Sequence, residues 1–289
     1  MSRHRAVDAP SPPTTPDAPD APRRGGRRLR RLAGAAVIVA AGVVAATGVA
    51  ASGGAQRGGD STAAPRRELP FGIGERLEYD AKVGPLKVGR GHMEVVAMEP
   101  VRGQEALHIS FRVSGGALGI RVEDALDSWV DPRTFSSVRF IQELEERGKE
   151  RDRRYEIFPD RGVYSRNGEP EQASVARPLD EGALFYYVRT LPLTVGETYE
   201  LDRYFRPDRN PVRIRVLRRE RVKVPAGEFD AIVIQPIIKT KGLFSESART
   251  ELWLSDDDRR ILLKMVSQLP FGSLSLHLKR AVDAPGVTP

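Results

Sequence analysis

The chain of 289 residues contains no cysteine. This absence excludes disulfide scaffolds, thiolate zinc sites, cysteine nucleophiles and lipid attachment through an N-terminal cysteine. Histidine and tryptophan are scarce, with four and two residues. What is present is typical of a folded protein, because a hydrophobic share of 40% with a charged share of 29% excludes both a disordered chain and a polytopic membrane protein. The length is enough for one large β domain or two ordinary ones.

Positive charge is distributed unevenly along the chain. The net charge is +7, but residues 1–31 alone hold eight arginines and three aspartates. The remaining residues therefore carry a net charge of only +2. A folded part so close to neutral lacks the basic surface of a nucleic-acid-binding domain, so we expect no nucleic-acid partner.

An uncharged run of small and aliphatic residues spans 32–51, directly after the arginine-rich block. Cations followed by an apolar run are typical of a segment that enters the export machinery. At about 1.5 Å per residue, the run is long enough to cross a hydrocarbon layer of about 30 Å as an anchor. Its many alanines and glycines, and small-residue pairs such as Val49 and Ala51, also fit a cleaved signal peptide. We expect an exported protein on the periplasmic side of the inner membrane, either anchored through 32–51 or released by cleavage.

Composition divides the chain into five parts. The leader, 1–31, is rich in Pro, Asp and Arg and is predicted to be a disordered cytoplasmic segment. After the membrane or signal segment, 32–51, a Gly-, Ala- and Ser-rich stretch over 52–67 predicts a flexible linker. An exported β domain is predicted over 68–282 and a loose tail over 283–289.

Hydrophobic residues alternate with polar residues in most of the predicted domain. In 107–113, for example, Leu107 and Ile109 alternate with His108 and Ser110. Alternation with a period of two indicates a strand with one buried and one solvated face. Strands are predicted at 77–83, 88–98, 107–113, 121–130, 135–145, 152–158, 197–206, 212–216, 228–239, 250–255, 260–268 and 274–278. So many strands with short connections predict an antiparallel sheet.

A single segment has the helical period instead. Asp180 is placed to cap its amino end and Pro192 to end it. One helical face gathers Leu184, Tyr187, Val188 and Leu191. The only large partner for that face is the sheet. The predicted fold class is therefore mainly β: a curved antiparallel sheet or incomplete barrel with one amphipathic helix on its concave side.

Several short motifs in a fixed order resemble a known bacterial family, the domain of unknown function 3108. They are Phe71–Tyr79, with Gly72 and Gly74, Leu86–Gly91, Leu184–Arg189, Val222–Phe229 and Glu251–Asp257. The resemblance covers roughly residues 71–278. It implies an exported protein whose β fold is similar to the incomplete barrels of periplasmic lipoprotein carriers. The resemblance carries over no catalytic residues.

Catalytic motifs are missing from the sequence. It has no Gly-x-Ser-x-Gly elbow, no His-Glu-x-x-His and no phosphate-binding loop that ends in Gly-Lys-Ser/Thr. Gly72-Ile-Gly74 and Gly89-Arg-Gly91 lack the third glycine and the following helix of a dinucleotide site, so we interpret them as a strand entry and a bulge. We predict a protein that is not an enzyme, with no catalytic residues, no cofactor and no metal site.

Two groups of titratable residues have an alternative functional interpretation. His92, His108 and His277 each alternate with apolar neighbours, so we expect them on the solvated sheet face. A hydrolase would require one of them to approach an acidic side chain inside a pocket. Asp256, Asp257 and Asp258 could bind calcium, but we interpret them as an acidic hairpin tip.

Apolar residues suggest a ligand instead. Stretches 231–238 and 261–266 are apolar on both faces, as in strands that are covered on two sides or that line a cavity. The residues predicted to line a hydrophobic pocket are Trp129, Leu184, Phe185, Tyr187, Val188 and Trp253. The alternative is that these side chains simply fill the core.

The resulting hypothesis is a non-enzymatic envelope protein that binds a lipid or the acyl chain of a lipoprotein in its curved sheet. An alternative is a scaffolding protein that binds another protein through a sheet edge or through the charged hairpin near 143–154. A stripe of arginines could face anionic lipid headgroups, unless acidic residues on adjacent strands neutralise it. The stripe consists of Arg213, Arg215, Arg218, Arg219 and Arg221.

Overall fold

The computed structural model describes residues 69–117, 120–146, 149–239, 244–269 and 272–284. These residues all fall within one compact unit. The predicted leader, membrane segment and linker lie outside the described residues. Within the described ranges, no helix has both the length and the apolar character needed to span a membrane.

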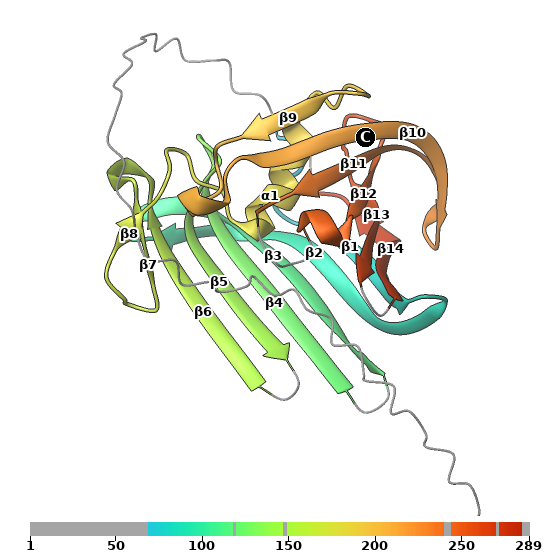
Figure 1. Cartoon of the computed structure of the whole chain (residues 1–289), viewed down its shortest axis with the longest axis horizontal. Coiled ribbons are helices and arrows are strands. Elements are labelled where there is room, and N and C mark those ends of the chain that lie inside the picture. The colour runs from blue at the N-terminus through green and yellow to red at the C-terminus, as the bar shows by residue number, and fades with distance from the viewer. Residues whose placement is uncertain (1–68, 118–119, 147–148, 240–243, 270–271, 285–289) are drawn as a thin grey trace, which may run out of the picture. The chain divides into compact units, whose positions relative to one another are not determined.

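Fourteen strands form one antiparallel sheet (Figure 1). Their bounds are β1 Arg76–Val83, β2 Leu86–Val101, β3 Gln104–Ala117, β4 Ile120–Asp131, β5 Ser136–Glu146, β6 Lys149–Phe158, β7 Val163–Arg166, β8 Gln172–Ala173, β9 Thr198–Leu201, β10 Val212–Val224, β11 Gly227–Ile237, β12 Glu251–Ser255, β13 Leu262–Leu269 and β14 Gly272–Val282. The order is β8-β7-β6-β5-β4-β3-β2-β1-β14-β13-β12-β11-β10-β9, so the first and last long strands of the domain, β1 and β14, lie side by side. The predicted mainly β, antiparallel architecture is confirmed.

Each of the twelve predicted strands corresponds to a strand of the sheet, but some bounds differ: the strand predicted at 212–216 continues to Val224, and that predicted at 107–113 spans Gln104–Ala117. β7 and β8 were not predicted, because they have only four and two residues. The strand predicted at 197–206 is limited to β9, since the chain turns away after Leu201. At the other end of the domain, Ala284 is buried, so order extends slightly into the predicted tail.

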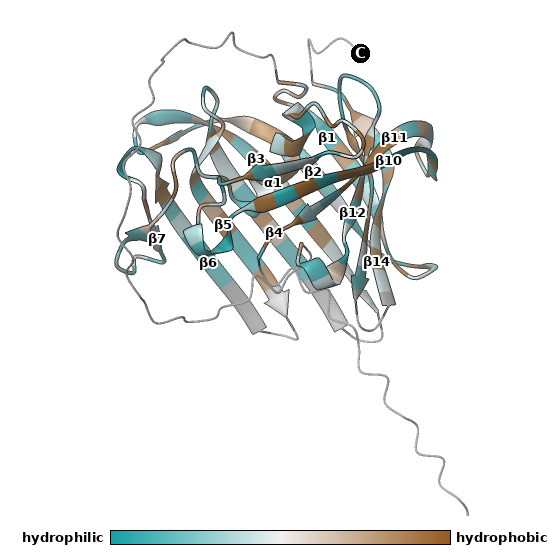
Figure 2. Cartoon of the chain, turned by 45° about the horizontal axis from the view of Figure 1, so that its top comes forward, coloured by the Kyte–Doolittle hydropathy of each residue, from teal (hydrophilic) through white to brown (hydrophobic). Residues whose placement is uncertain are grey.

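Alternation along the strands creates the core. In β1, Leu77, Tyr79 and Ala81 are buried, while Glu78 and Asp80 between them are half-buried. Apolar and polar bands alternate in the same way along the other strands (Figure 2). Most of the buried set forms one large cluster inside the curve of the sheet. The opposite face carries the charged residues and a small second cluster of Val101, Ala106, Trp129 and Val138.

Helix α1, Glu181–Tyr187, packs on β3 and β4 inside the curve of the sheet (Figure 1). The Asp180 carboxylate accepts a hydrogen bond from Ala183 N at 2.9 Å, as the predicted cap requires. The helix is shorter than predicted, because a 3-10 turn over Val188–Thr190 follows it. It is also not amphipathic, since every residue from Glu181 to Tyr186 is buried.

The chain between β8 and β9 links the two edges of the sheet. Phe205 N donates to Leu179 O at 3.0 Å, and the Ser174 hydroxyl donates to Phe205 O at 2.7 Å. A parallel bridge joins Leu179 to Tyr204. These contacts join segments next to the two edge strands, although the sheet itself does not close.

Candidate functional site

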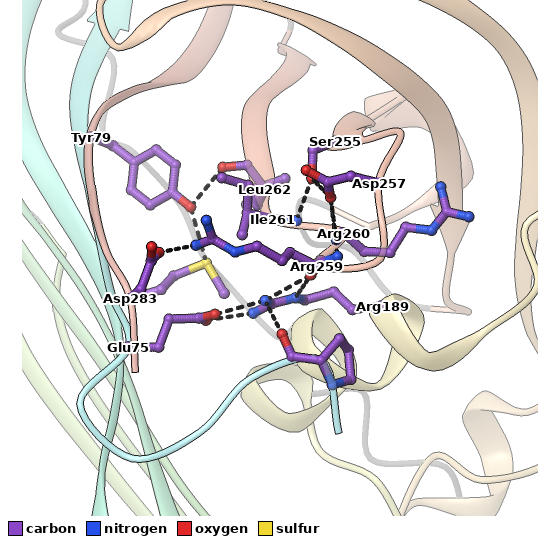
Figure 3. A network of polar contacts seen from close by, with 12 residues as sticks. Glu75, Tyr79, Arg189, Ser255, Asp257, Arg259, Arg260, Ile261, Leu262 and Asp283 are labelled. Atoms are coloured by element: carbon purple, nitrogen blue, oxygen red, sulfur yellow. Dashed lines mark hydrogen bonds and ion pairs between the residues drawn. The ribbon is translucent and has the colours of Figure 1, made fainter. Parts of the chain in front are cut away.

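A buried ion pair fixes the start of the domain to the end of the helix (Figure 3). Arg189 donates from Nη1 and Nη2 to the two oxygens of Glu75, at 2.6 and 2.8 Å. Its Nη2 also reaches Pro70 O at 3.1 Å and Arg259 O at 2.9 Å. Both side chains are almost wholly buried, with exposures of 0% and 3%. Because Arg189 bonds to both oxygens of Glu75 and both side chains are buried, we interpret the cluster as structural.

The same network includes the turn between β12 and β13 (Figure 3). Arg259 donates to Asp283, near the end of the described chain. The Asp257 carboxylate accepts from Arg259 N at 3.1 Å and from Arg260 N at 3.0 Å. Asp256 pairs with Arg260 at 3.0 Å. These acids stabilise a tight turn, in agreement with their interpretation as a hairpin tip.

A second polar cluster lies on the outer face of β2, β3 and β4. The two ring nitrogens of His108 lie 3.0 Å from Glu99 Oε1 and 2.9 Å from Asp127 Oδ1. Burial alone lowers the pKa of His108, but the hydrogen bonds to Asp127 and Glu99 outweigh burial and raise it. With both nitrogens bonded, the imidazole has no free lone pair for general-base catalysis.

The two tryptophans predicted to line a pocket lie apart from the helix. Ser128 bonds to Asp180 at the start of α1, so the next residue, Trp129, faces the other side of the sheet. There its indole stacks on His108, with ring centroids 4.4 Å apart. The indole of Trp253 donates to Glu220 at 2.6 Å, and the Lys264 ammonium lies 4.4 Å from its ring. Trp129 also packs in the small cluster with Val101, Ala106 and Val138, whereas Trp253 belongs to the large core cluster. The two indoles thus lie in different apolar clusters, and each has a polar partner.

The four helical residues of the predicted pocket are packed against other side chains. Phe185 lies 5.4 Å from Phe111 and 5.2 Å from Phe244, measured between ring centroids. Leu184 and Val188 are buried in the same cluster. The Arg203 guanidinium covers the half-buried ring of Tyr187 at 4.5 Å. These contacts favour the core role that the sequence left as the alternative.

Acidic residues neutralise most of the arginine stripe on β10. Arg213 pairs with Glu200 at 2.8 Å, Arg218 with Glu251 at 2.8 Å, Arg219 with Asp256 at 2.7 Å and Arg221 with Glu228 at 3.8 Å. Arg215 is exposed, and no described residue pairs with it. A stripe compensated in this way is a poor surface for anionic headgroups.

An open groove crosses the outer face of β14, β1, β2, β3 and β4. Polar and charged side chains line it, among them Arg76, Asp80, Arg90, His92, Arg112, Ser114 and Lys279. Strand register places these side chains in rows: His92 lies between Glu78 on β1 and Arg112 on β3. Arg90 lies between Asp80 and Ser114 in the next row.

Two glycines allow the strands to approach each other closely at the groove. Gly89 on β2 lies opposite Gly115 on β3. A Cβ atom on Gly89 would lie 2.3 Å from Ser114 O, and one on Gly115 would lie 2.5 Å from Val88 O. The pairing of β1 with β2 also shifts by one residue beside Gly89, as expected for a bulge. The glycines and the bulge thus produce a sharp local bend in β2.

The groove contains more unpaired basic groups than unpaired acidic groups. Lys87 neutralises Asp80 at 2.6 Å, and Arg76 pairs with Glu78 at 3.3 Å. No described residue hydrogen-bonds to or pairs with Arg90, His92 or Lys279. Arg112 donates from Nη2 to Asp127 at 2.7 Å, while its buried Nη1 atom has no partner.

The histidines do not meet the requirement for a hydrolase. His92 lines the groove, but within the described residues no acid hydrogen-bonds to it, and burial followed by Arg76 lowers its pKa. His108 contacts two acids but is not among the groove residues. Burial, Lys82 and Lys264 lower the pKa of His277 to about 4. In the described ranges, no group of three potential ligands is arranged to hold a metal ion.

A family model described as "Protein of unknown function (DUF3108)" matches residues 78–279. Solved structures give weaker similarities. A β-barrel-like protein of domain of unknown function DUF1849 from Brucella abortus is 9% identical, with 74% of this chain and 99% of that chain covered and a TM-score of 0.49. A "putative lipoprotein" from Parabacteroides distasonis is 11% identical, with 74% and 98% covered and a TM-score of 0.33. No curated protein matches the chain.

Proposed function

Since the chain belongs to the DUF3108 family, which is described only as a protein of unknown function, we propose its function from the site itself. The proposed function is that of a non-enzymatic, exported protein of the cell envelope that binds a polar ligand in the groove across β14 and β1–β4. The observation that supports it best is the combination of an open hollow with Arg90, His92 and Lys279 unpaired inside it.

A polar ligand fits this groove for a physical reason. Hydrogen bonds to charged groups contribute about 1.5–3 kcal/mol each where they are shielded from water, and less at an exposed site. Arg90 and Lys279 are exposed, so each contact is worth little alone. A ligand with several polar groups would gain from contacts along several rows of side chains.

We propose the groove on the outer face as the binding site, instead of the lipid-binding surface that the sequence led us to expect on the concave side. A lipid on the concave side would have to displace Phe185 from Phe111 and Phe244, or separate the helix from β4. Each such contact buries apolar surface worth about 25 cal/mol per Å². Lipid binding therefore remains as an outcome that the experiment below can reveal.

The short edges of the sheet give little support to the scaffolding alternative. The edge strands β8 and β9 have two and four residues, and short edges are poor templates for strand addition. In the charged hairpin, Arg154 already pairs with Glu156 at 2.9 Å.

Native mass spectrometry of the full-length chain, extracted from membranes in mild detergent, tests the proposed function. Ser114→Trp places a large side chain in the groove, because Ser114 lines it. Thr198→Trp on exposed β9 is the matched control. We expect a bound mass on the wild-type chain and on Thr198→Trp that is lost in Ser114→Trp. Equal occupancy in all three chains, or a bound lipid unaffected by Ser114→Trp, would contradict the groove as the binding site.

The proposed location has a separate test. The arginine block before the apolar run at 32–51 supports export. A periplasm-dependent reporter fused after Pro289 should be active, and a cytosol-dependent reporter at the same position should be inactive. The reverse result would exclude export.

A further inference from the structure

We propose that the groove recognises an oxyanion, a phosphate or carboxylate group carried by the ligand, through Arg90 and Lys279, with the guanidinium of Arg112 as a third basic group. This inference rests on the proposed function and specifies the chemistry of its ligand. The three donors come from β2, β14 and β3, so the site exists only when these strands are assembled in the sheet.

The positions of the donors suit a single negative group. β2 and β14 are both neighbours of β1, so their backbones lie about 10 Å apart at the usual strand spacing. Lysine and arginine have long, flexible side chains, so Lys279 and Arg90 can extend toward each other above β1. Arg112 is one row from Arg90 and adjacent to His92. Its side chain is partly exposed, with Nη2 bonded to Asp127 and Nη1 buried, so Arg112 contributes positive charge beside the other two groups.

Charge pairing within the groove also favours an anion. Glu78 and Asp80 are the acids that β1 contributes to the groove, and Arg76 and Lys87 already neutralise them. Glu123 and Asp124, at the β4 side, also take part in interactions. An incoming cation would therefore compete with existing partners, whereas an anion would meet unpaired donors.

His92 provides a spectroscopic probe of the same site. Burial lowers its pKa, Arg76 and Arg112 lower it further, and Glu94 and Glu78 raise it. A bound oxyanion would stabilise the imidazolium and shift the titration of His92 upward.

Calorimetric titration of the full-length chain at low salt tests the inference, with inorganic phosphate and citrate as the two probes. Phosphate and carboxylate ligands are thereby distinguished. We expect saturable binding of at least one probe, about tenfold weaker in Arg90→Ala/Lys279→Ala, because two exposed charge contacts are removed. Arg215→Ala removes an exposed, unpaired arginine outside the groove and should leave the affinity unchanged. Binding should weaken with added salt, because exposed charges are screened.

Two results would overturn the inference: no binding of either probe to the wild-type chain, or equal affinity in the double variant. Thermal unfolding of each variant checks that the fold is kept. A bound neutral molecule that Ser114→Trp displaces would leave the proposed function intact and reject the oxyanion. If neither probe binds and Ser114→Trp displaces no bound molecule, the groove itself is rejected as a binding site.

Discussion

At the scale of single residues, the buried carboxyl of Asp180 gives stability an unusual pH dependence. Burial raises its pKa to about 7, although Ser128 and Ala183 N donate to its Oδ1 atom. Its Oδ2 atom has no partner. Since the folded pKa is higher than that of an exposed aspartate, about 3.9, the folded state favours the protonated form. The protonated Asp180 carboxyl therefore contributes its full share of the unfolding free energy below pH 4, and this share is lost as the pH rises to about 7.

Asp180→Asn should remove this dependence. Asparagine keeps the oxygen that caps the helix and cannot ionise. Between pH 5 and pH 8, the free energy of unfolding of the wild-type chain should fall relative to that of the variant, by about 2.5 kcal/mol. Urea unfolding at several pH values measures the difference. Asp202→Asn, at an exposed position, should follow the wild-type curve, and a curve for Asp180→Asn parallel to the wild type would contradict the prediction.

The three histidines of the domain should titrate separately. Their order follows from their neighbours: carboxylates hold His108 in its charged form, whereas burial and nearby cations favour the neutral forms of His92 and His277. Nuclear magnetic resonance of labelled imidazoles should give a pKa above 6.5 for His108, below 6.5 for His92 and about 4 for His277. A pKa of His92 higher than that of His108 would contradict the hydrogen bonds assigned between His108 and its two carboxylate partners.

At the scale of elements, Arg189 connects segments distant in sequence. It joins the entry to β1, the end of α1 and the turn between β12 and β13. Arg189→Met would leave Glu75 charged and buried, at a cost of about 3–5 kcal/mol in unfolding free energy. Chemical denaturation should show this loss.

A double variant separates charge from packing at this site. Glu75→Leu/Arg189→Met removes both charges, so it should recover part of the stability that Arg189→Met loses. Recovery should be incomplete, since the carbonyls of Pro70 and Arg259 also lose their donor. A double variant no more stable than Arg189→Met would show that the ion pair is not the source of the effect.

The close approach of β2 and β3 leads to a prediction about Gly89. A methyl group there would meet the backbone of Ser114 and Gly115, which cannot move as a side chain could. Gly89→Ala should therefore lower stability by about 1–3 kcal/mol or more. Ser114→Ala, on the facing strand, leaves the backbone at this contact unchanged and should have little effect. Thermal unfolding of both variants tests the contact, and equal melting temperatures would contradict it.

Particular elements show how much the sequence could predict. The alternation in β1 and β3 identified these strands because each has one buried and one solvated face. The cap at Asp180 identified the start of the helix. The groove could not be predicted, since it depends on which residues lie opposite each other after the bulge beside Gly89. Gly89 and Gly91 gave the signal in the sequence. Their interpretation as a bulge agrees with the register shift, but it did not indicate that a groove would form there.

The residues predicted to line a hydrophobic pocket lie on two sides of the sheet for a related reason. Trp129 and Phe185 are both aromatic, but strand alternation from Ser128 places Trp129 on the opposite side of the sheet. Composition alone does not reveal this separation. The charged residues inside two family motifs, Glu75 and Arg189, were the signal of the buried ion pair, because charges amid apolar residues in a core helix and a strand entry require partners.

At the scale of the whole molecule, the two faces of the sheet have different roles in this account. The concave face holds α1 and the apolar cluster, and these contacts stabilise the fold. The outer face of β14 and β1–β4 carries the groove, with the unpaired donors Arg90 and Lys279. Ligand binding on the outer face would leave the core intact, so binding and stability can be changed independently.

Hydrogen–deuterium exchange of the full-length chain, before and after its co-purified ligand is removed, tests this division most directly. The account predicts that the ligand slows exchange in peptides that contain Arg90, His92 and Ser114, and that exchange in residues 181–187 of the helix stays the same. Protection that appears in the helix and is absent from β2 and β3 would show that the ligand enters the concave side, and would contradict the central claim.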